Sequence, residues 1–388
     1  MTSAVRTAEP IDLVVVRDQV EGVVEEFLAA KATAAAGCGH PPEVVRILRD
    51  FLASGGKRLR PLLCVVGWYA AGAGEDGTRT GLPGAPGADG GGDPAGRVRG
   101  GVLGDDGASA LRVAASLELY QTFVLIHDDI IDDSALRRGR PAVHRALAAR
   151  HVGHDSAARL GAGEALLAGN LALIWSQELL HTAGLDTARL AQVHRINDAM
   201  LAEVMFGQYR DLLGAERLDD DIEAALGIIR YKTAAGTIQR PLQLGVAAGG
   251  GDRSVLDFCT DFGVPLGEAF QLRDDLLDVF GSPDGRSAPG LNDLREGKHT
   301  VLLALAMAGA GAGQRVRLRS LVGRAALDEA GAAEIRAIVE DTGAREGVEE
   351  MISARYDRCL GVLDAAALPE RASAALRNLA VTATQYTA

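Results

Sequence analysis

Two groups of aspartates carry the most chemistry in this sequence. The first group, Asp128, Asp129, Asp132 and Asp133, ends an apolar run that begins at Leu117. In a helix, Asp128 and Asp132 lie one turn apart on the same face, where two carboxylates repel each other unless a cation bridges them. Carboxylate oxygens are ligands for hard cations. The spacing therefore predicts a metal site, with Mg²⁺ as the expected ion.

The residues that follow these aspartates indicate that the site also binds an anion. Arg137 and Arg138 follow the first group directly, and guanidinium groups beside a metal ion favour binding of an anion such as diphosphate. The second group, Asp274-Asp275-Leu276-Leu277-Asp278, repeats the Asp-Asp-x-x-Asp spacing 146 residues after the first. One such group could be a solvated helix face, but two copies within apolar sequence favour a functional site.

The two motifs resemble those of the trans-isoprenyl diphosphate synthases, the polyprenyl synthetase family, and the resemblance spans roughly residues 40–305. It implies an all-α isoprenoid synthase fold, a single large helical bundle around a deep central cavity. It also implies that the two motifs face each other across the cavity and hold three Mg²⁺ ions per site. The metal ligands implied are Asp128, Asp132, Asp274 and Asp278.

Lysine is rare in this chain and its positions are informative. Of 40 basic residues only four are lysines: Lys31, Lys57, Lys232 and Lys298. A planar guanidinium does not replace the compact ammonium group in a tight phosphate site. Because the last three lie in segments that resemble diphosphate-binding motifs of the family, we predict that they bind diphosphate.

One set of residues resembles the family's site for isopentenyl diphosphate. The segment 56–61, Gly-Lys-Arg-Leu-Arg-Pro, places three cations beside a pair of glycines, a pattern typical of a phosphate cradle. By resemblance, Lys57, Arg60 and Arg138 bind the diphosphate of isopentenyl diphosphate. Gln121 lies two turns before Asp128, shares its helix face, and is implied to contact the same substrate.

A second set resembles the family's site for the allylic diphosphate. The resemblance implies that Arg137, Lys232 and Lys298 bind this diphosphate. Thr233 and Gln271 would direct oxygen dipoles at the developing allylic cation. The predicted catalytic residues are therefore Arg137, Lys232, Thr233 and Gln271. No side-chain base is evident, so the released diphosphate is expected to remove the final proton.

Other positions near these motifs have supporting roles or depart from the family. Gln208 and Asp211, in the family's Gly-Gln motif, are expected to support the site from behind. Gly169-Asn170 stands where an aspartate is usual, and Gly285-Arg286 stands where Gly-Lys is usual. We do not rely on Arg286 for diphosphate binding.

The chain is expected to be helical throughout, with one exception. Apolar periodicity and breakers predict helices over 11–30, 41–53, 108–136, 164–181, 186–213 and 221–245, then one carrying the second aspartate group and several over 301–388. Glycine fills 14 of the 36 positions in 72–107, with three prolines and no aromatic residue. Such a segment cannot bury enough apolar surface to offset its ordering entropy. We predict a disordered insert at 72–107 within a single domain that spans 1–388.

Composition limits the partners and the compartment. The net charge of −12 argues against nucleic acid or an anionic membrane as partner. Four scattered cysteines without a C-x-x-C motif indicate free thiols in a reducing cytoplasm. No signal core is present and charges interrupt the apolar runs, so the sequence predicts a soluble cytoplasmic protein without a membrane span. The resemblance implies a homodimer.

Product length depends on residues just before the first aspartate. In the family, bulky residues four and five positions before it form the floor of the prenyl cavity, and here these are Val124 and Phe123. The aromatic at the fifth position resembles geranylgeranyl (C20) synthases, with farnesyl or longer (C25 and above) products as alternatives. On an ideal helix Val124 lies about 80° from Asp132 and Phe123 about 180°. Helix geometry alone favours Val124 over Phe123. We follow the resemblance and expect Phe123 to limit product length, because a curved prenyl tail or a distorted helix can bring it into contact.

Three other functions compete with this interpretation. A di-iron bundle could use Glu178-x-x-His181 and Glu296-x-x-His299, but it leaves the paired aspartates and arginines unexplained. A class I terpene cyclase would carry a different second metal motif and an aromatic-rich pocket, whereas aromatics are only 4% of this chain. A non-catalytic partner subunit of another synthase would be expected to lose one motif. Two diphosphate sites imply two diphosphate substrates, which favours condensation.

Overall fold

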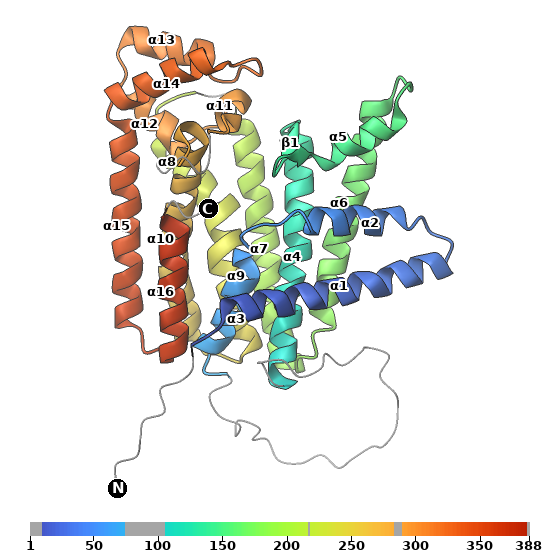
Figure 1. Ribbon diagram of the computed structural model, residues 1–388. Coiled ribbons are helices and arrows are strands. Elements are labelled where there is room, and N and C mark those ends of the chain that lie inside the picture. The colour runs from blue at the N-terminus through green and yellow to red at the C-terminus, as the bar shows by residue number, and fades with distance from the viewer. Residues whose placement is uncertain (1–9, 74–104, 216–217, 283–288, 386–388) are drawn as a thin grey trace, which may run out of the picture. The chain divides into compact units, whose positions relative to one another are not determined.

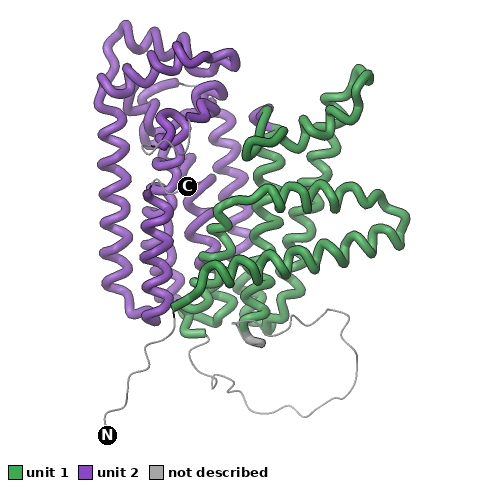
Figure 2. Tube along the Cα trace, in the orientation of Figure 1, with its two compact units in different colours: residues 1–130, 135–193, 244–252 green, residues 131–134, 194–243, 253–388 purple. Residues whose placement is uncertain are grey.

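The computed structural model describes residues 10–73, 105–215, 218–282 and 289–385, and these are helical apart from one short hairpin (Figure 1). The all-α fold class predicted from the sequence is confirmed. Backbone contacts divide the chain into two compact units, residues 1–130, 135–193 and 244–252 in unit 1 and residues 131–134, 194–243 and 253–388 in unit 2 (Figure 2). Most of the predicted insert, residues 74–104, lies outside the described residues.

Unit 1 contains the N-terminal helices and the first two residues of the first aspartate motif, Asp128 and Asp129. A side-chain cap starts its first helix, because Asp12 accepts the backbone N–H groups of Val14 and Val15. α7 (Thr187–Gly214) and α9 (Arg240–Ala248) each have residues in both units. The other elements are α1 (Leu13–Gly37), α2 (Glu43–Leu52), α3 (Leu59–Ala70), α4 (Asp105–Ile131), β1 (Leu136–Arg137), β2 (Arg140–Pro141), α5 (Val143–Ala148), η1 (Ala149–His151) and α6 (Ala157–His181).

The helix that carries the first motif ends earlier than predicted. α4 stops at Ile131 rather than near residue 136, because Asp133 adopts a left-handed conformation (φ 51°) that an α-helix cannot continue. β1 and β2 then pair antiparallel, with Arg137 opposite Arg140. The two turn residues, Arg138 (φ 53°) and Gly139 (φ 73°), both have the positive φ that a tight hairpin turn requires.

α6 is the most apolar long helix in the described part of the chain. It begins at Ala157, seven residues before the predicted start. By length and composition it alone among the described helices could cross a membrane, and 28% of its most apolar window is buried. A single helix of this kind is weak evidence for a span, since core helices share these properties.

Unit 2 is built around the helix that carries the second motif. This helix, α10 (Arg253–Phe280), packs against η2, α15 and α16. The aliphatic core of the unit lies between α8, α10, α12, α14 and α15. The remaining elements are α8 (Ile222–Ile228), η2 (Ile229–Gln239), α11 (Asn292–Glu296), α12 (Val301–Gly309), α13 (Ala312–Leu321), α14 (Glu329–Asp341), α15 (Ala344–Ala365) and α16 (Glu370–Thr384).

The helix predicted over 221–245 is not a uniform α-helix. Its middle part, η2, is an 11-residue π-helix between α8 and α9. π-Helices are rare and usually short, and they occur frequently at functional sites. A side-chain carbon at Gly207 of α7 would lie within 3.0 Å of the backbone of Lys232, and one at Gly267 of α10 equally close to Ala234. Both neighbouring helices therefore pack directly on the backbone of η2.

Candidate active site

Two aspartates of the first motif, Asp128 and Asp129, lie with the hairpin arginine in unit 1. Arg137 donates its Nε–H to Oδ1 of Asp129 at 2.8 Å, and one of its terminal nitrogens is 3.6 Å from Oδ2 of Asp128. Burial raises the pKa of Asp129, and Arg137 opposes that rise. The other carboxylate oxygen of Asp129 is buried without a hydrogen-bond partner. Asp129, which sequence analysis gave no role, therefore orients Arg137.

Asp132, the first residue past α4, contacts the third predicted diphosphate lysine. Lys298 donates to Oδ2 of Asp132 at 2.8 Å and lies 3.2 Å from Oε2 of Glu296. All three residues belong to unit 2. The structure thus brings together a predicted metal ligand and a predicted diphosphate ligand that are 166 positions apart in the chain.

The residues predicted to bind isopentenyl diphosphate surround the loop before α3. Arg138 donates to Oγ of Ser54 at 3.1 Å and to the carbonyl oxygen of Gly55, which places it against the loop that carries the exposed Lys57. Arg60 lies in the first turn of α3, where burial lowers its pKa. Oε1 of Gln121 is buried and without a hydrogen-bond partner.

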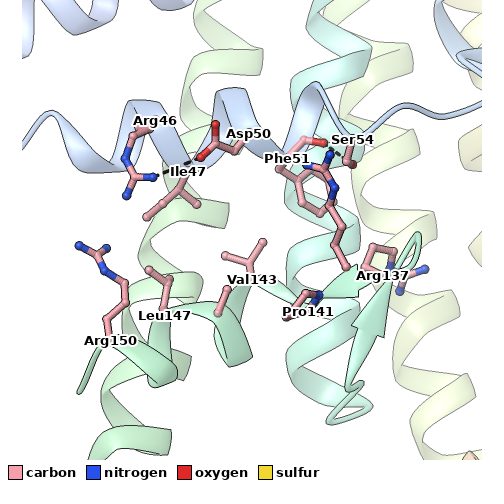
Figure 3. A pocket seen from close by; sticks show the side chains of 12 residues that line it. Arg46, Ile47, Asp50, Phe51, Ser54, Arg137, Pro141, Val143, Leu147 and Arg150 are labelled. Atoms are coloured by element: carbon pink, nitrogen blue, oxygen red, sulfur yellow. Dashed lines mark hydrogen bonds and ion pairs between the residues drawn. The ribbon is translucent and has the colours of Figure 1, made fainter. Parts of the chain in front are cut away.

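A pocket of about 280 Å³ lies in unit 1 between α2 and the segment from the hairpin to α5 (Figure 3). Its walls include the apolar side chains of Phe51, Val143 and Leu147. Arg137 is the one predicted substrate-binding residue among those that line it. Arg46, also in the lining, forms ion pairs with Glu43 and Asp50, which neutralise it. Arg138, another predicted diphosphate ligand, contacts two of the lining residues, because it donates to Oγ of Ser54 and its guanidinium lies 5.7 Å from the ring centre of Phe51.

The residues predicted to act on the allylic substrate form a connected set in unit 2. Lys232 donates to Oδ2 of the buried Asp211 at 2.6 Å. The hydroxyl of Thr233 donates to Oε1 of Gln271 at 2.9 Å, and Nε2 of Gln271 donates to Oδ1 of Asp275 at 2.8 Å. Burial raises the pKa of Asp275 well above its ordinary value. Asp211 therefore supports Lys232 from behind, and Asp275 orients Gln271.

The two outer aspartates of the second motif have different surroundings. Asp274 is half-buried on α10. The carboxylate of Asp278 accepts the backbone N–H of Asp293 at 3.0 Å, next to the start of α11. Burial raises the pKa of Asp278 and raises that of Asp293 to about 7, although Lys298 lowers both. Asp278 thus holds the segment that leads to Lys298.

The donor atoms of the two motifs suit a hard divalent cation by their chemistry. All are carboxylate oxygens, the ligands that Mg²⁺ prefers. Arg137 and Lys298 pair with carboxylates of the first motif and supply positive charge that a metal would otherwise bring. Within the described ranges, no three acidic, histidine or cysteine side chains are close enough to share one ion.

The two residues predicted to set product length differ in their packing. Phe123 is 5% exposed, and its ring stacks edge to face on His127 at 4.6 Å between centroids. A side chain at Gly169 of α6 would collide with the His127 ring, so Phe123 and His127 lie on the side of α4 that packs on α6. Val124 is half-buried. Gly169 makes room for His127, and Asn170, which stands where an aspartate is usual, is exposed. Arg286 lies outside the described residues.

Comparison with known proteins identifies a family. Residues 41–340 match the polyprenyl synthetase family. The short chain isoprenyl diphosphate synthase of Methanothermobacter thermautotrophicus is 31% identical over 306 residues, which cover 79% of each chain. The geranylfarnesyl diphosphate synthase of Aeropyrum pernix is 29% identical over 328 residues, which cover 84% of this chain and 89% of that protein.

A crystal structure gives the same result for the fold. The geranylgeranyl pyrophosphate synthase from Corynebacterium glutamicum, complexed with isoprenyl diphosphate and magnesium, superposes with a TM-score of 0.85 at 36% identity. The match covers 97% of this chain and all of that one. Because the family match covers most of the chain, this protein belongs to the polyprenyl synthetase family and is a prenyl diphosphate synthase, a transferase of prenyl groups.

Proposed function

We propose that the protein condenses isopentenyl diphosphate with dimethylallyl, geranyl or farnesyl diphosphate and releases geranylgeranyl diphosphate (C20). The observation that carries the chain length is the buried aromatic side chain of Phe123, five residues before Asp128. The 36% identity to a protein named geranylgeranyl pyrophosphate synthase supports the same length. Relatives named for farnesyl and geranylfarnesyl products, each 29% identical, make C15 and C25 the alternatives.

In this proposal, a basic cluster in unit 1 holds isopentenyl diphosphate. Lys57, Arg60 and Arg138 bind its diphosphate. Arg138 hydrogen-bonds Ser54 and Gly55, which lie in the loop that carries Lys57. Gln121 would donate its amide N–H to the same diphosphate. Holding the homoallylic double bond in front of the allylic C1 converts a bimolecular encounter into an intramolecular step.

The allylic diphosphate is held by Arg137, Lys232 and Lys298, and it leaves as C1 is attacked. Asp128, Asp132, Asp274 and Asp278 would hold Mg²⁺, three ions per site, which stabilises negative charge on the leaving diphosphate when bound. The Thr233 hydroxyl and the Gln271 amide, held together at 2.9 Å, present oxygen dipoles to the allylic cation. The departing diphosphate removes a proton from the condensed product, and loss of that proton forms the new double bond.

We also propose that the protein acts as a cytoplasmic homodimer. Large apolar side chains are exposed on α6 (Leu166, Leu167 and Ile174) and, separately, on α7 (Phe206 and Tyr209 among others). Exposed apolar patches of this kind mark interaction surfaces. The four cysteines are free thiols, and three are buried, as suits a reducing compartment. Light scattering on the purified protein would give twice the chain mass.

Product analysis by mass spectrometry tests the proposed reaction. The protein is incubated with Mg²⁺, isopentenyl diphosphate and each allylic primer in turn. A C20 diphosphate is expected from all three primers. A C15 or C25 product would show that the proposed chain length is wrong, whereas the proposed condensation reaction would stand. A hydrocarbon formed from the allylic substrate alone would instead indicate a cyclase.

A further inference from the structure

A buried carboxylate outside the predicted site bridges two arginines in unit 2. Glu268 of α10 is 6% exposed. It accepts the Nε–H of Arg230 from η2 at 2.5 Å and the Nε–H of Arg355 from α15 at 2.6 Å. A buried carboxylate is costly unless it is paired and hydrogen-bonded, and here both of its oxygens are satisfied. The three side chains therefore form a clamp, the Glu268 clamp, that ties η2 to α10 and α15.

The Glu268 clamp lies one helical turn from the residues proposed to bind the allylic substrate. Arg230 precedes Thr233 by three residues, and Glu268 precedes Gln271 by three residues. Among the contacts between α10 and η2 are two side-chain hydrogen bonds, Arg230–Glu268 and Thr233–Gln271. Lys232 lies between these two hydrogen bonds.

Helix α7 contacts the residues between these two hydrogen bonds. The guanidinium of Arg210 lies 4.9 Å from the ring centre of Tyr231, and Asp211 accepts a hydrogen bond from Lys232. Lys232 can therefore reach its present position only while η2 keeps its place between its neighbours.

The unusual helix type explains why such a clamp is needed. A π-helix pairs residues five apart, whereas an α-helix pairs residues four apart, so the same 11 residues in α form would present Lys232 and Thr233 at other angles around the axis. The π form is the less common one, so tertiary contacts must stabilise it. An ion pair at the start of η2 supplies such a contact, because Arg230 is its second residue.

We infer that Glu268 is a positioning residue for the allylic diphosphate: through Arg230 it holds η2 in the π form that directs the ammonium of Lys232 and the hydroxyl of Thr233 toward this substrate. Glu268 itself touches neither substrate nor metal. The inference rests on the proposed role of Lys232. It adds Glu268, a residue that the sequence motifs did not indicate.

The test is a steady-state comparison of Glu268→Gln with the wild-type enzyme. Glutamine keeps the size of the side chain but loses the charge that pairs with both arginines. Displacements of about 1 Å at a site can cost about a hundredfold in rate, so we expect the KM for the allylic substrate to rise by about tenfold or more. The KM for isopentenyl diphosphate is expected to stay within about twofold, because Lys57, Arg60 and Arg138 lie in unit 1.

The chain offers a control pair between the same two helices, α10 and α15. Glu349 of α15 accepts two hydrogen bonds at 2.7 Å from the buried Arg273 of α10, and neither of these residues belongs to η2. Glu349→Gln therefore removes a comparable ion pair and should lower the unfolding temperature similarly while leaving the allylic KM unchanged. If Glu268→Gln does no more than this control, the inference is wrong.

Two further variants keep the result interpretable. Arg230→Gln removes the other half of the clamp at a side chain that is 42% exposed, so it should fold and show the same selective rise in allylic KM. Lys232→Ala reports on the proposed function itself. An unchanged allylic KM in Lys232→Ala would overturn the role of Lys232, whereas a rise there without one in Arg230→Gln and Glu268→Gln would overturn the clamp alone.

Discussion

The four lysines divide into one structural residue and three at the proposed site. Lys31 pairs with Glu178 at 2.5 Å and lies 5.0 Å from the ring centre of Phe27, an arrangement internal to unit 1. Lys232 and Lys298 each donate to an aspartate within 2.8 Å. Short contacts of this kind suit a compact ammonium group, which explains why arginine, frequent elsewhere in the chain, is absent from these positions.

Lys232→Arg and Lys298→Arg should each lower turnover by about tenfold or more, an amount equal to about 1.4 kcal/mol of transition-state stabilisation. The charge is kept, but a planar guanidinium cannot occupy the same space beside Asp211 or Asp132. Arg286→Ala should cost less, because its segment departs from the family pattern. Lys31→Arg serves as the control and should leave turnover unchanged. The ordering fails if Arg286→Ala is the most damaging of the variants.

Product length gives a second test at single residues. Phe123→Ala should let chains grow beyond C20, and Val124→Phe should shorten them towards C15, as read by mass spectrometry of the extracted products. The Phe123 ring packs on His127, on the side of α4 next to α6, so its removal acts by opening space there. Unchanged products from Phe123→Ala, with shortening by Val124→Phe, would show that the angular argument from an ideal helix was the better guide.

Among the elements, η2 depends most on its neighbours. A side chain at Gly207 would overlap the backbone of Lys232, which cannot move as cheaply as a side chain. Gly207→Ala should therefore lower both turnover and stability, the latter by about 1–3 kcal/mol as is typical of overpacking. Gly163→Ala in α6, where nothing lies within 4 Å, is the matched control and should be neutral or stabilising. Thermal unfolding and steady-state rates distinguish the two, and equal effects would refute the close-packing argument.

Local sequence patterns predicted the elements whose signals are themselves local. α7 begins and ends within one residue of the predicted bounds, 186–213, because apolar periodicity marks it. The early end of α4 was missed, since the left-handed residue that causes it, Asp133, is not a glycine. The π form of η2 was missed because it depends on backbone packing by α7 and α10, which no local pattern records.

The predicted site shows the same division. The aspartate motifs follow from residue type and spacing, and the diphosphate lysines follow from the resemblance of their segments to the family's motifs. The contacts of Glu268 with Arg230 and Arg355 span 38 and 87 positions, and a single glutamate within an apolar helix gives no sign of them. Asp129 was passed over for a similar reason, since its bond to Arg137 depends on the hairpin that follows α4.

For the molecule as a whole, the glycine-rich segment 72–107 should be dispensable. α3 ends at Ala70 and α4 begins at Asp105, so a deletion that stops at residue 104 and leaves a short linker keeps both helices. Folding, monitored by circular dichroism, and turnover should both be preserved, because the segment is too poor in apolar side chains to contribute to a core. Loss of folding would show that the segment packs on the rest of the protein.

The central claim is that both aspartate motifs serve one condensation reaction. The most direct test is the turnover of Asp128→Ala and Asp274→Ala, with Asp257→Ala, an exposed aspartate of α10 paired with Arg253, as the control. Loss of a ligand that stabilises charge on the leaving group removes several kcal/mol, so each motif variant should lose at least about 10³-fold in rate, with an unchanged circular dichroism spectrum. Asp257→Ala should match the wild type. A near-normal rate in either purified, folded motif variant would contradict the account.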